Sequence, residues 1–143
     1  MQAIRMMDDQ RQTDQPAGPL APFEIEREPD RHFLRMTLRG VWDEETFQAF
    51  GAAYAHALAA MKPTGGVELS LVDGRIFGIQ PAEISDRFAS LLTQVDPHPQ
   101  RRSAFVTSAI LNKVQARQVS DLLNARYFKT VESAIDWLFG DEA

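Results

Sequence analysis

The residues best suited to chemistry in this 143-residue chain are an aspartate and an arginine within the stretch VELSLVDGRIFGI. Asp73 and Arg75 follow an alternating strand and flank a glycine, so we expect them in a turn at the end of that strand. Strand ends of this kind line the crevice in which open α/β sheets bind ligands. Arg75 could bind an anion or a partner's carboxylate there, assisted by free N–H groups of a helix starting near Pro81. The alternative is that the two residues only cap or brace their own loop.

Other residue types that support catalysis or metal binding form no recognised pattern. The chain contains no cysteine, which excludes thiol nucleophiles, disulfides and cysteine-bound metals. His32, His56 and His98 lack the spacing of a metal-binding helix. There is no G-x-S-x-G elbow, and PTGGVE lacks the Lys-Ser/Thr of a phosphate-binding loop and precedes a strand. We therefore expect a protein that is not an enzyme and that has no cofactor and no metal.

Two charged runs have simple structural explanations. The acidic residues Asp43, Glu44 and Glu45 suit the positively polarised start of a helix. Arg101 and Arg102 precede a strand and could contact an acidic partner, although two arginines do not make a basic surface. The net charge of -5 argues against broad binding to nucleic acids.

The composition is typical of one globular domain. Hydrophobic residues make up 44% and charged residues 24%, enough for a core without metals or disulfides. No apolar run approaches the ~20 residues of a membrane span, and the N-terminus has no apolar signal segment. Together with the absence of cysteine, this fits a cytoplasmic protein. Residues 1–22, rich in Asp, Gln and Pro, predict a disordered N-terminal tail, with a partner-binding tail as the alternative.

Apolar spacing predicts the elements that position Asp73 and Arg75. Residues 23–27 and 33–40 alternate between apolar and polar, which predicts an antiparallel hairpin around the turn EPDR. A helix follows, with Asp43 as its N-cap, apolar residues every three or four positions, and KPTGG as its end. Residues 67–72 then predict a third strand.

The second half of the chain predicts three more helices and two short strands. A helix begins at Pro81, SAFVT forms a strand, and a third helix runs from about Ile110 to Asn124. RYF is a brief strand, and Thr130 caps the last helix. The predicted order is β-β-α-β-α-β-α-β-α.

This order predicts an α/β fold with a mixed sheet of four or five strands, joined by right-handed crossovers after the hairpin. The first three strands alternate in polarity, whereas strands buried on both faces would be apolar throughout. We therefore expect the helices mainly on one face, with Leu69 and Leu71 of the third strand facing them. The other face would meet water or a partner, and it would carry Glu24, Glu26, Arg35, Arg39, Glu68 and Ser70.

With these elements placed, the chain resembles the SpoIIAA-like family, which is related in fold to STAS domains of the anti-sigma-factor-antagonist type. The resemblance rests on the order of LRGVWDEETFQAF, LSLVDGRIFGIQPAEI, RRSAFVT and RYFKTVESAIDWL. It implies a STAS-like domain over residues 23–140. Some STAS relatives are switched by phosphorylation of a Ser that follows an Asp after the third strand. Asp73 is present here, but Gly74 stands where that Ser is expected, so the resemblance does not extend to the switch.

Two functions stay open. The first is a non-catalytic regulatory or protein-interaction module of the STAS-like type, acting on a protein partner or as a homodimer. The second is a domain that binds a small molecule, such as a lipid or an organic anion, near Asp73 and Arg75.

Overall fold

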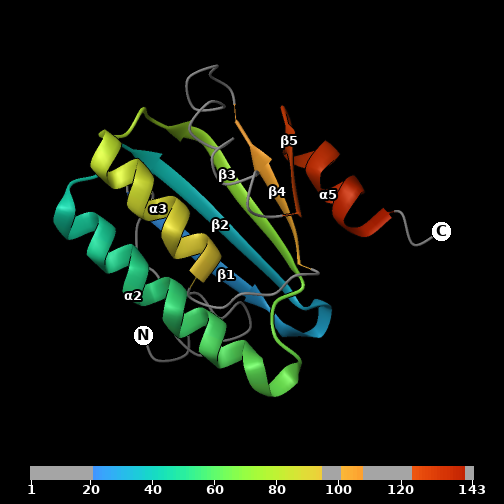
Figure 1. Ribbon diagram of the computed structural model, residues 1–143. Coiled ribbons are helices and arrows are strands. Elements are labelled where there is room, and N and C mark those ends of the chain that lie inside the picture. Colours follow the sequence, from blue (N-terminus) through green and yellow to red (C-terminus); the bar gives the residue numbers. More distant parts are fainter. Residues whose placement is uncertain (1–20, 95–100, 108–123, 141–143) are drawn as a thin grey trace, which may run out of the picture.

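The computed structural model describes residues 21–94, 101–107 and 124–140, which form a five-stranded sheet with helices (Figure 1). The strands are β1 (Phe23–Glu28), β2 (Phe33–Gly40), β3 (Leu69–Phe77), β4 (Arg102–Val106) and β5 (Asn124–Phe128). The helices are α2 (Glu44–Met61), α3 (Ala82–Gln94) and α5 (Val131–Phe139), with short 3-10 turns at Pro29–Arg31 and Lys62–Thr64. The expected helix at 110–124 lies outside these residues except for Asn124, which begins β5, and residues 1–20 of the expected tail also lie outside them.

The strands lie in the sheet in the order of the sequence, β1-β2-β3-β4-β5. β1 and β2 pair antiparallel, with Ile25 opposite Met36, and the other neighbouring strands pair parallel. The mixed sheet of four or five strands predicted from the sequence is therefore confirmed and has five strands, including the hairpin and the short last strand.

Local signals fix the helix starts. The Asp43 carboxylate accepts a hydrogen bond from the Thr46 backbone N–H at 2.8 Å, which satisfies one of the free N–H groups at the start of α2. The Thr130 hydroxyl does the same for the Ser133 N–H at 3.1 Å, at the start of α5. Both N-caps were predicted, and both are confirmed.

α2 and α3 lie side by side over one face of the sheet, called here the α2/α3 face (Figure 1). The core on this face is aromatic at its centre. Phe50 is fully buried on α2, and four other aromatic rings surround it. The distances from the Phe50 ring centroid to their centroids are 5.0 to 5.8 Å, and the rings belong to Phe23, Trp42, Tyr54 and Phe88. The pair with Tyr54 is stacked and the other three are edge-to-face or tilted, and aromatic pairs of these kinds add to the free energy of burying each ring.

α5 packs on the opposite face of the sheet, called here the α5 face, over β3, β4 and β5. Its buried residues Ala134 and Leu138 form a second core cluster with apolar side chains of the strands, which are Phe33, Leu71, Ala104 and Val106. The expectation of helices mainly on one face thus holds for α2 and α3, and α5 is the exception. β3 and β4 are buried on both faces, and most of their buried side chains are apolar.

The faces predicted for β3 are wrong. Leu71 faces α5, whereas Ser70 and Val72 lie on the α2/α3 face. Ser70 is buried, and its hydroxyl donates to the Ser103 hydroxyl on β4 at 3.0 Å. This bond lets two polar side chains lie within an apolar layer, because buried polar groups need a hydrogen-bonding partner.

Away from α5, the α5 face carries partly exposed polar side chains on β1 and β2, as predicted. The Arg39 guanidinium forms a salt bridge with Glu24 on the neighbouring strand at 3.1 Å and also donates to the backbone carbonyl of Ala21 at 2.8 Å. Glu26 lies opposite Arg35 across the same two strands. Opposite charges therefore face each other across this part of the sheet.

Candidate functional site

β3 is longer than the sequence indicates. It does not end at Val72 but continues to Phe77, so the turn expected at 73–75 is wrong. The apolar residues after the glycine keep the chain in the sheet, since Phe77 pairs with Gly40 and packs against Trp42. Asp73 and Arg75 therefore belong to a strand rather than to a loop.

An extra residue in β3 explains the position of these two side chains. Thr37 and Arg39 are two residues apart on β2, but their partners Asp73 and Ile76 are three residues apart on β3. The additional residue, around Gly74, makes a β-bulge, a feature that re-aims side chains and is frequent near functional sites. Asp73 and Ile76 consequently share a face with Thr37 and Arg39. An isolated glycine in a strand pattern is a signal for such a bulge.

Asp73 and Arg75 form a close internal pair at the bulge. The Asp73 carboxylate is buried and accepts hydrogen bonds from Nε and Nη2 of Arg75 at 2.9 and 2.8 Å, and from the Arg75 backbone N–H at 3.3 Å. Burial raises the pKa of Asp73, but the bonds from Arg75 and the charges of Arg75 and Arg35 outweigh it and hold the pKa below the ordinary 3.8.

The pair orients Arg75 without hiding it. Its side chain is 49% exposed, compared with 6% for Asp73, so part of the guanidinium stays at the surface in a fixed direction. The bonds brace the bulge, as the simpler alternative supposed. The involvement of Asp73 and Arg75 in binding remains a prediction.

Asp73→Asn is expected to remove about 1 kcal/mol of stability at neutral pH, a modest value because solvent screens the exposed part of Arg75. The folded-state pKa of Asp73 lies below the unfolded value, so its stabilising effect is complete above about pH 5 and is lost as the pH falls below 3.8. The stability difference between the wild type and Asp73→Asn should therefore shrink in urea unfolding at acidic pH. A stability difference between the wild type and Asp73→Asn that stays constant down to the lowest pH would contradict this expectation. So would an equal stability difference between the wild type and the exposed control Asp30→Asn.

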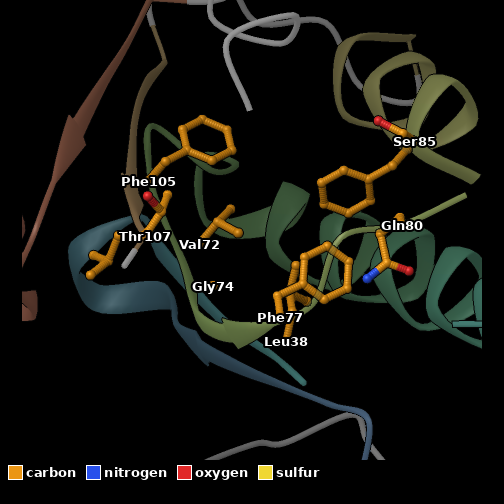
Figure 2. A pocket seen from close by; sticks show the side chains of 10 residues that line it. Leu38, Val72, Gly74, Phe77, Gln80, Ser85, Phe105 and Thr107 are labelled. Atoms are coloured by element: carbon orange, nitrogen blue, oxygen red, sulfur yellow. The ribbon is translucent and has the colours of Figure 1, made fainter. Parts of the chain in front are cut away.

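A small apolar cavity lies on the α2/α3 face, where β3 and β4 end and α3 begins (Figure 2). Its volume is about 50 Å³, and its apolar lining includes Leu38, Val72, Phe77, Phe88 and Phe105, with polar atoms from Gln80, Ser85 and Thr107. Asp73 and Arg75 do not line it, because the pair lies on the other face of the sheet. The structure therefore separates the predicted site residues from the cavity.

A buried glutamine holds the edge of the cavity together. The Gln80 side-chain oxygen accepts from the Trp42 backbone N–H at 2.8 Å, and its amide nitrogen donates to the carbonyls of Gly40 and Gly78 at 2.9 and 2.8 Å. This Gln80 clamp joins the chain entering α2 to the chain entering α3. The sequence does not indicate this clamp, because a single glutamine before a proline carries no signal for contacts about 40 residues away.

Three aliphatic side chains are exposed on the two segments that the Gln80 clamp joins. They are Val41, Ile76 and Ile79, with exposed fractions of 65%, 62% and 51%. The Gly78 N–H donates to the Gly40 carbonyl at 2.9 Å, which brings the two segments together. A Cβ at Gly78 would lie 2.8 Å from Val41 Cγ2, so a larger residue there would displace the Val41 side chain. We call these three residues the aliphatic cluster.

The remaining candidate residues have structural positions. Arg101 is buried and donates to the Val67 carbonyl at 2.8 Å, and Arg102 donates to the Leu138 carbonyl at 2.8 Å near the end of α5. His32 has a left-handed backbone (φ 54°) where the first turn enters β2, and His98 lies outside the described residues. Among the residues described, no group of three or more His, Cys, Asp or Glu side chains could hold a metal ion.

Comparison with known proteins identifies the fold. No protein-family model matches the chain, and no curated protein matches it. An uncharacterised DUF3478-family protein with a SpoIIAA-like fold from Shewanella loihica PV-4 is a similar solved structure, with a TM-score of 0.61 and 19% identity over 86% of this chain and 98% of that one. An anti-sigma factor antagonist from Mycobacterium paratuberculosis has a TM-score of 0.55 and 10% identity over 86% and 98%.

The anti-sigma factor antagonist SpoIIAA in its unphosphorylated form is also similar, with a TM-score of 0.55 and 15% identity over 82% of this chain and 96% of that one. The chain therefore has the SpoIIAA-like fold, as its sequence suggested. At these identities the likeness establishes the fold alone. Within the described ranges, no helix is long and apolar enough to cross a membrane.

Proposed function

We propose that this protein is a non-catalytic regulatory module that acts in the cytoplasm by binding another protein. The aliphatic cluster is the observation that carries the proposal. Three branched side chains exposed by half or more, on two segments that are hydrogen-bonded to each other, favour a protein-binding surface, whereas single exposed aliphatics are ordinary. Two structures with the same fold are named anti-sigma factor antagonists, a name that describes action on another protein.

Asp73 and Arg75 add a polar contact to this surface. Arg75 precedes Ile76 in β3, and its guanidinium is already oriented by two side-chain bonds to Asp73. An oriented arginine loses little conformational freedom when a partner's carboxylate binds, and arginines are common among residues that dominate interface energies. We therefore assign Arg75 to the partner surface and Asp73 to the positioning of Arg75.

The proposed module works without the phosphorylation switch of some STAS domains. Gly74 offers no hydroxyl and is buried in β3. Of the nearest hydroxyls, Ser70 is buried against Ser103, and Ser85 lines the cavity from α3. Regulation would then depend on the amounts of partner and module rather than on modification of this part of β3.

The test uses the full chain as bait in extracts of its source organism, followed by titration of the purified partner. Ile76→Ser is expected to weaken binding by tenfold or more, and Arg75→Ala by several-fold, while the control Glu132→Ala on α5 leaves affinity unchanged. Failure to retain any protein, or a partner that binds both the Ile76→Ser and the Arg75→Ala variants like the wild type, would refute the proposal.

The cavity supports a second function, the binding of a small apolar molecule. Its apolar walls with an amide and two hydroxyls at the edge match the usual composition of ligand sites, which hold apolar groups and fix them by a few polar contacts. At about 50 Å³ it is smaller than the ~150 Å³ that accommodates benzene, so only a few heavy atoms fit unless α3 moves.

A thermal-shift screen with short-chain fatty acids, aromatic acids and longer lipids tests this function. A ligand at ~100 times its Kd would stabilise the fold by about 2.7 kcal/mol. Ser85→Phe, which fills the cavity from α3, should abolish the shift, whereas Ser90→Phe on an exposed position of the same helix should not. A screen without any saturable shift would exclude this second function for these ligand classes.

A further inference from the structure

The described walls of the cavity at the ends of β3 and β4 carry no charged side chain (Figure 2). Most of them are aromatic or aliphatic, and the polar side chains among them are Gln80, Ser85 and Thr107. Asp73 and Arg75, the charged pair of β3, are not among the lining residues. An ion inside the cavity would lose its water without gaining an ion pair from these walls, which costs far more than burying a neutral polar group. The walls therefore favour an uncharged ligand.

Two hydroxyls in the walls are available to a ligand. Both N–H bonds of the Gln80 amide are already used, because its nitrogen donates to the carbonyls of Gly40 and Gly78. The Ser85 hydroxyl on α3 and the Thr107 hydroxyl after β4 form no hydrogen bond with another described residue. A hydroxyl can donate one hydrogen bond and accept two, so this pair can bind either a carbonyl or a hydroxyl group.

Gly74 leaves part of the cavity open. Its backbone φ is not positive, so the conformation of β3 does not require glycine at this position. A Cβ there would lie 3.5 Å from the Val106 carbonyl oxygen and 3.6 Å from Phe77 Cβ, which are ordinary contact distances. Both of these residues line the cavity, so an alanine would fit and its methyl group would take up space beside them. The glycine thus keeps room that any side chain would fill.

We propose that this cavity binds a small uncharged molecule with one hydrogen-bonding group, such as a short-chain amide, alcohol or ketone. The polar group bonds the hydroxyls of Ser85 and Thr107, and the apolar part lies against Val72, Phe77 and Phe105. At about 50 Å³ the cavity holds only a few heavy atoms, which is the size of such molecules. This inference rests on the second of the two proposed functions and adds the chemical class of the ligand.

Propionamide and propionate are matched probes of this class, because they have the same size and shape and differ in charge at neutral pH. Molecules of so few atoms are expected to bind in the millimolar range, which NMR titration of the full chain can measure through its amide chemical shifts. Propionamide should bind tenfold or more tightly than propionate. The largest shifts should occur at residues 72–77, 84–88 and 105–107.

The pH separates exclusion of charge from a general preference for amides. Lowering the pH from ~7 to ~5 converts more of the propionate into neutral propionic acid, so its apparent affinity should rise tenfold or more. The affinity for propionamide should stay the same, because none of the described residues that line the cavity titrates in this range.

Three variants assign the binding to this cavity. Ser85→Ala combined with Thr107→Val removes both hydroxyls at nearly constant volume and should weaken propionamide binding tenfold or more. Gly74→Ala should weaken propionamide and propionic acid alike, because its methyl group occupies the space of the ligand. Ser90→Ala, at an exposed position of α3, is the control and should leave both affinities unchanged. Circular dichroism and the melting temperature should show that each variant folds, since none of these changes removes a hydrogen bond within the cavity.

Two results would overturn the inference and leave the second function intact. One is equal affinity of the wild type for propionamide and propionate at neutral pH, and the other is unchanged propionamide binding in the variant without both hydroxyls. Binding of neither probe would also overturn the inference. The second function would fail with it only if the thermal-shift screen gave no ligand either.

Discussion

Phe50→Ala is expected to lower the free energy of unfolding by about 4 kcal/mol, in the range measured for large-to-small changes of buried aromatic residues. Phe50 is fully buried, and four other rings surround its own within 6 Å. These rings come from β1, the entry to α2, α2 itself and α3, so their collapse into the vacated space would require several elements to move at once.

Urea unfolding at neutral pH measures this loss, and Phe128→Ala provides the matched control. Phe128 lies at the end of the edge strand β5 and is only partly buried, so its truncation should cost less than half as much. Equal effects of the two substitutions would show that the aromatic core on the α2/α3 face does not dominate stability.

Gln80→Leu is expected to cost about 3 kcal/mol, although leucine has a similar size and is more apolar. The substitution removes three hydrogen bonds and leaves the Trp42 N–H buried without its acceptor. An orphaned buried N–H costs about 1–3 kcal/mol on its own, and the lost bonds to Gly40 and Gly78 add to that.

Gln48→Leu is the control for Gln80→Leu, because Gln48 lies exposed on α2 and bonds only the neighbouring Glu44, at 2.7 Å. It should change stability by a few tenths of a kcal/mol. Hydrogen exchange at the Trp42 amide should become much faster in Gln80→Leu and stay unchanged in Gln48→Leu. Similar stability and exchange in the two variants would refute the role given to the clamp.

The parts of the fold that were predictable are those with local signals. The hairpin follows from alternating residues around a proline turn, and α2 and α5 follow from N-caps that bond groups three residues ahead. The parallel pairing of the later strands follows from the strand–helix–strand order of the sequence, because a crossover helix returns the chain to the end of the sheet where the previous strand began. These rules need only short sequence separations or general chain geometry.

The parts that failed depend on distant contacts. α5 has an apolar stripe, but the stripe does not specify which face of the sheet it will cover. In β3, apolar residues occur on both sides of the strand, so Leu71 could be assigned to either face, and the buried Ser70 was misassigned because its partner Ser103 lies 33 residues away. The strand was cut short at Asp73 because a glycine was interpreted as a turn rather than a bulge.

The candidate site was predictable only in part. Asp73 and Arg75 do meet, as adjacent polar residues around a glycine suggest, but they bond each other and lie on the face opposite the cavity. The aliphatic cluster escaped notice because exposure of Ile76 and Ile79 cannot be seen in an apolar run. Only the bulge and the Gln80 clamp determine which of those side chains turn outward.

The bond between the hydroxyls of Ser70 and Ser103 has a consequence for how this protein can evolve. Alanine at one position alone leaves the buried hydroxyl at the other position without a hydrogen-bonding partner, whereas alanine at both positions removes both hydroxyls. The effects of the two substitutions on stability should therefore be strongly non-additive in a double-mutant cycle. Divergent descendants of this sequence should then replace the two serines as a couple, and chains with a single replacement should be rare.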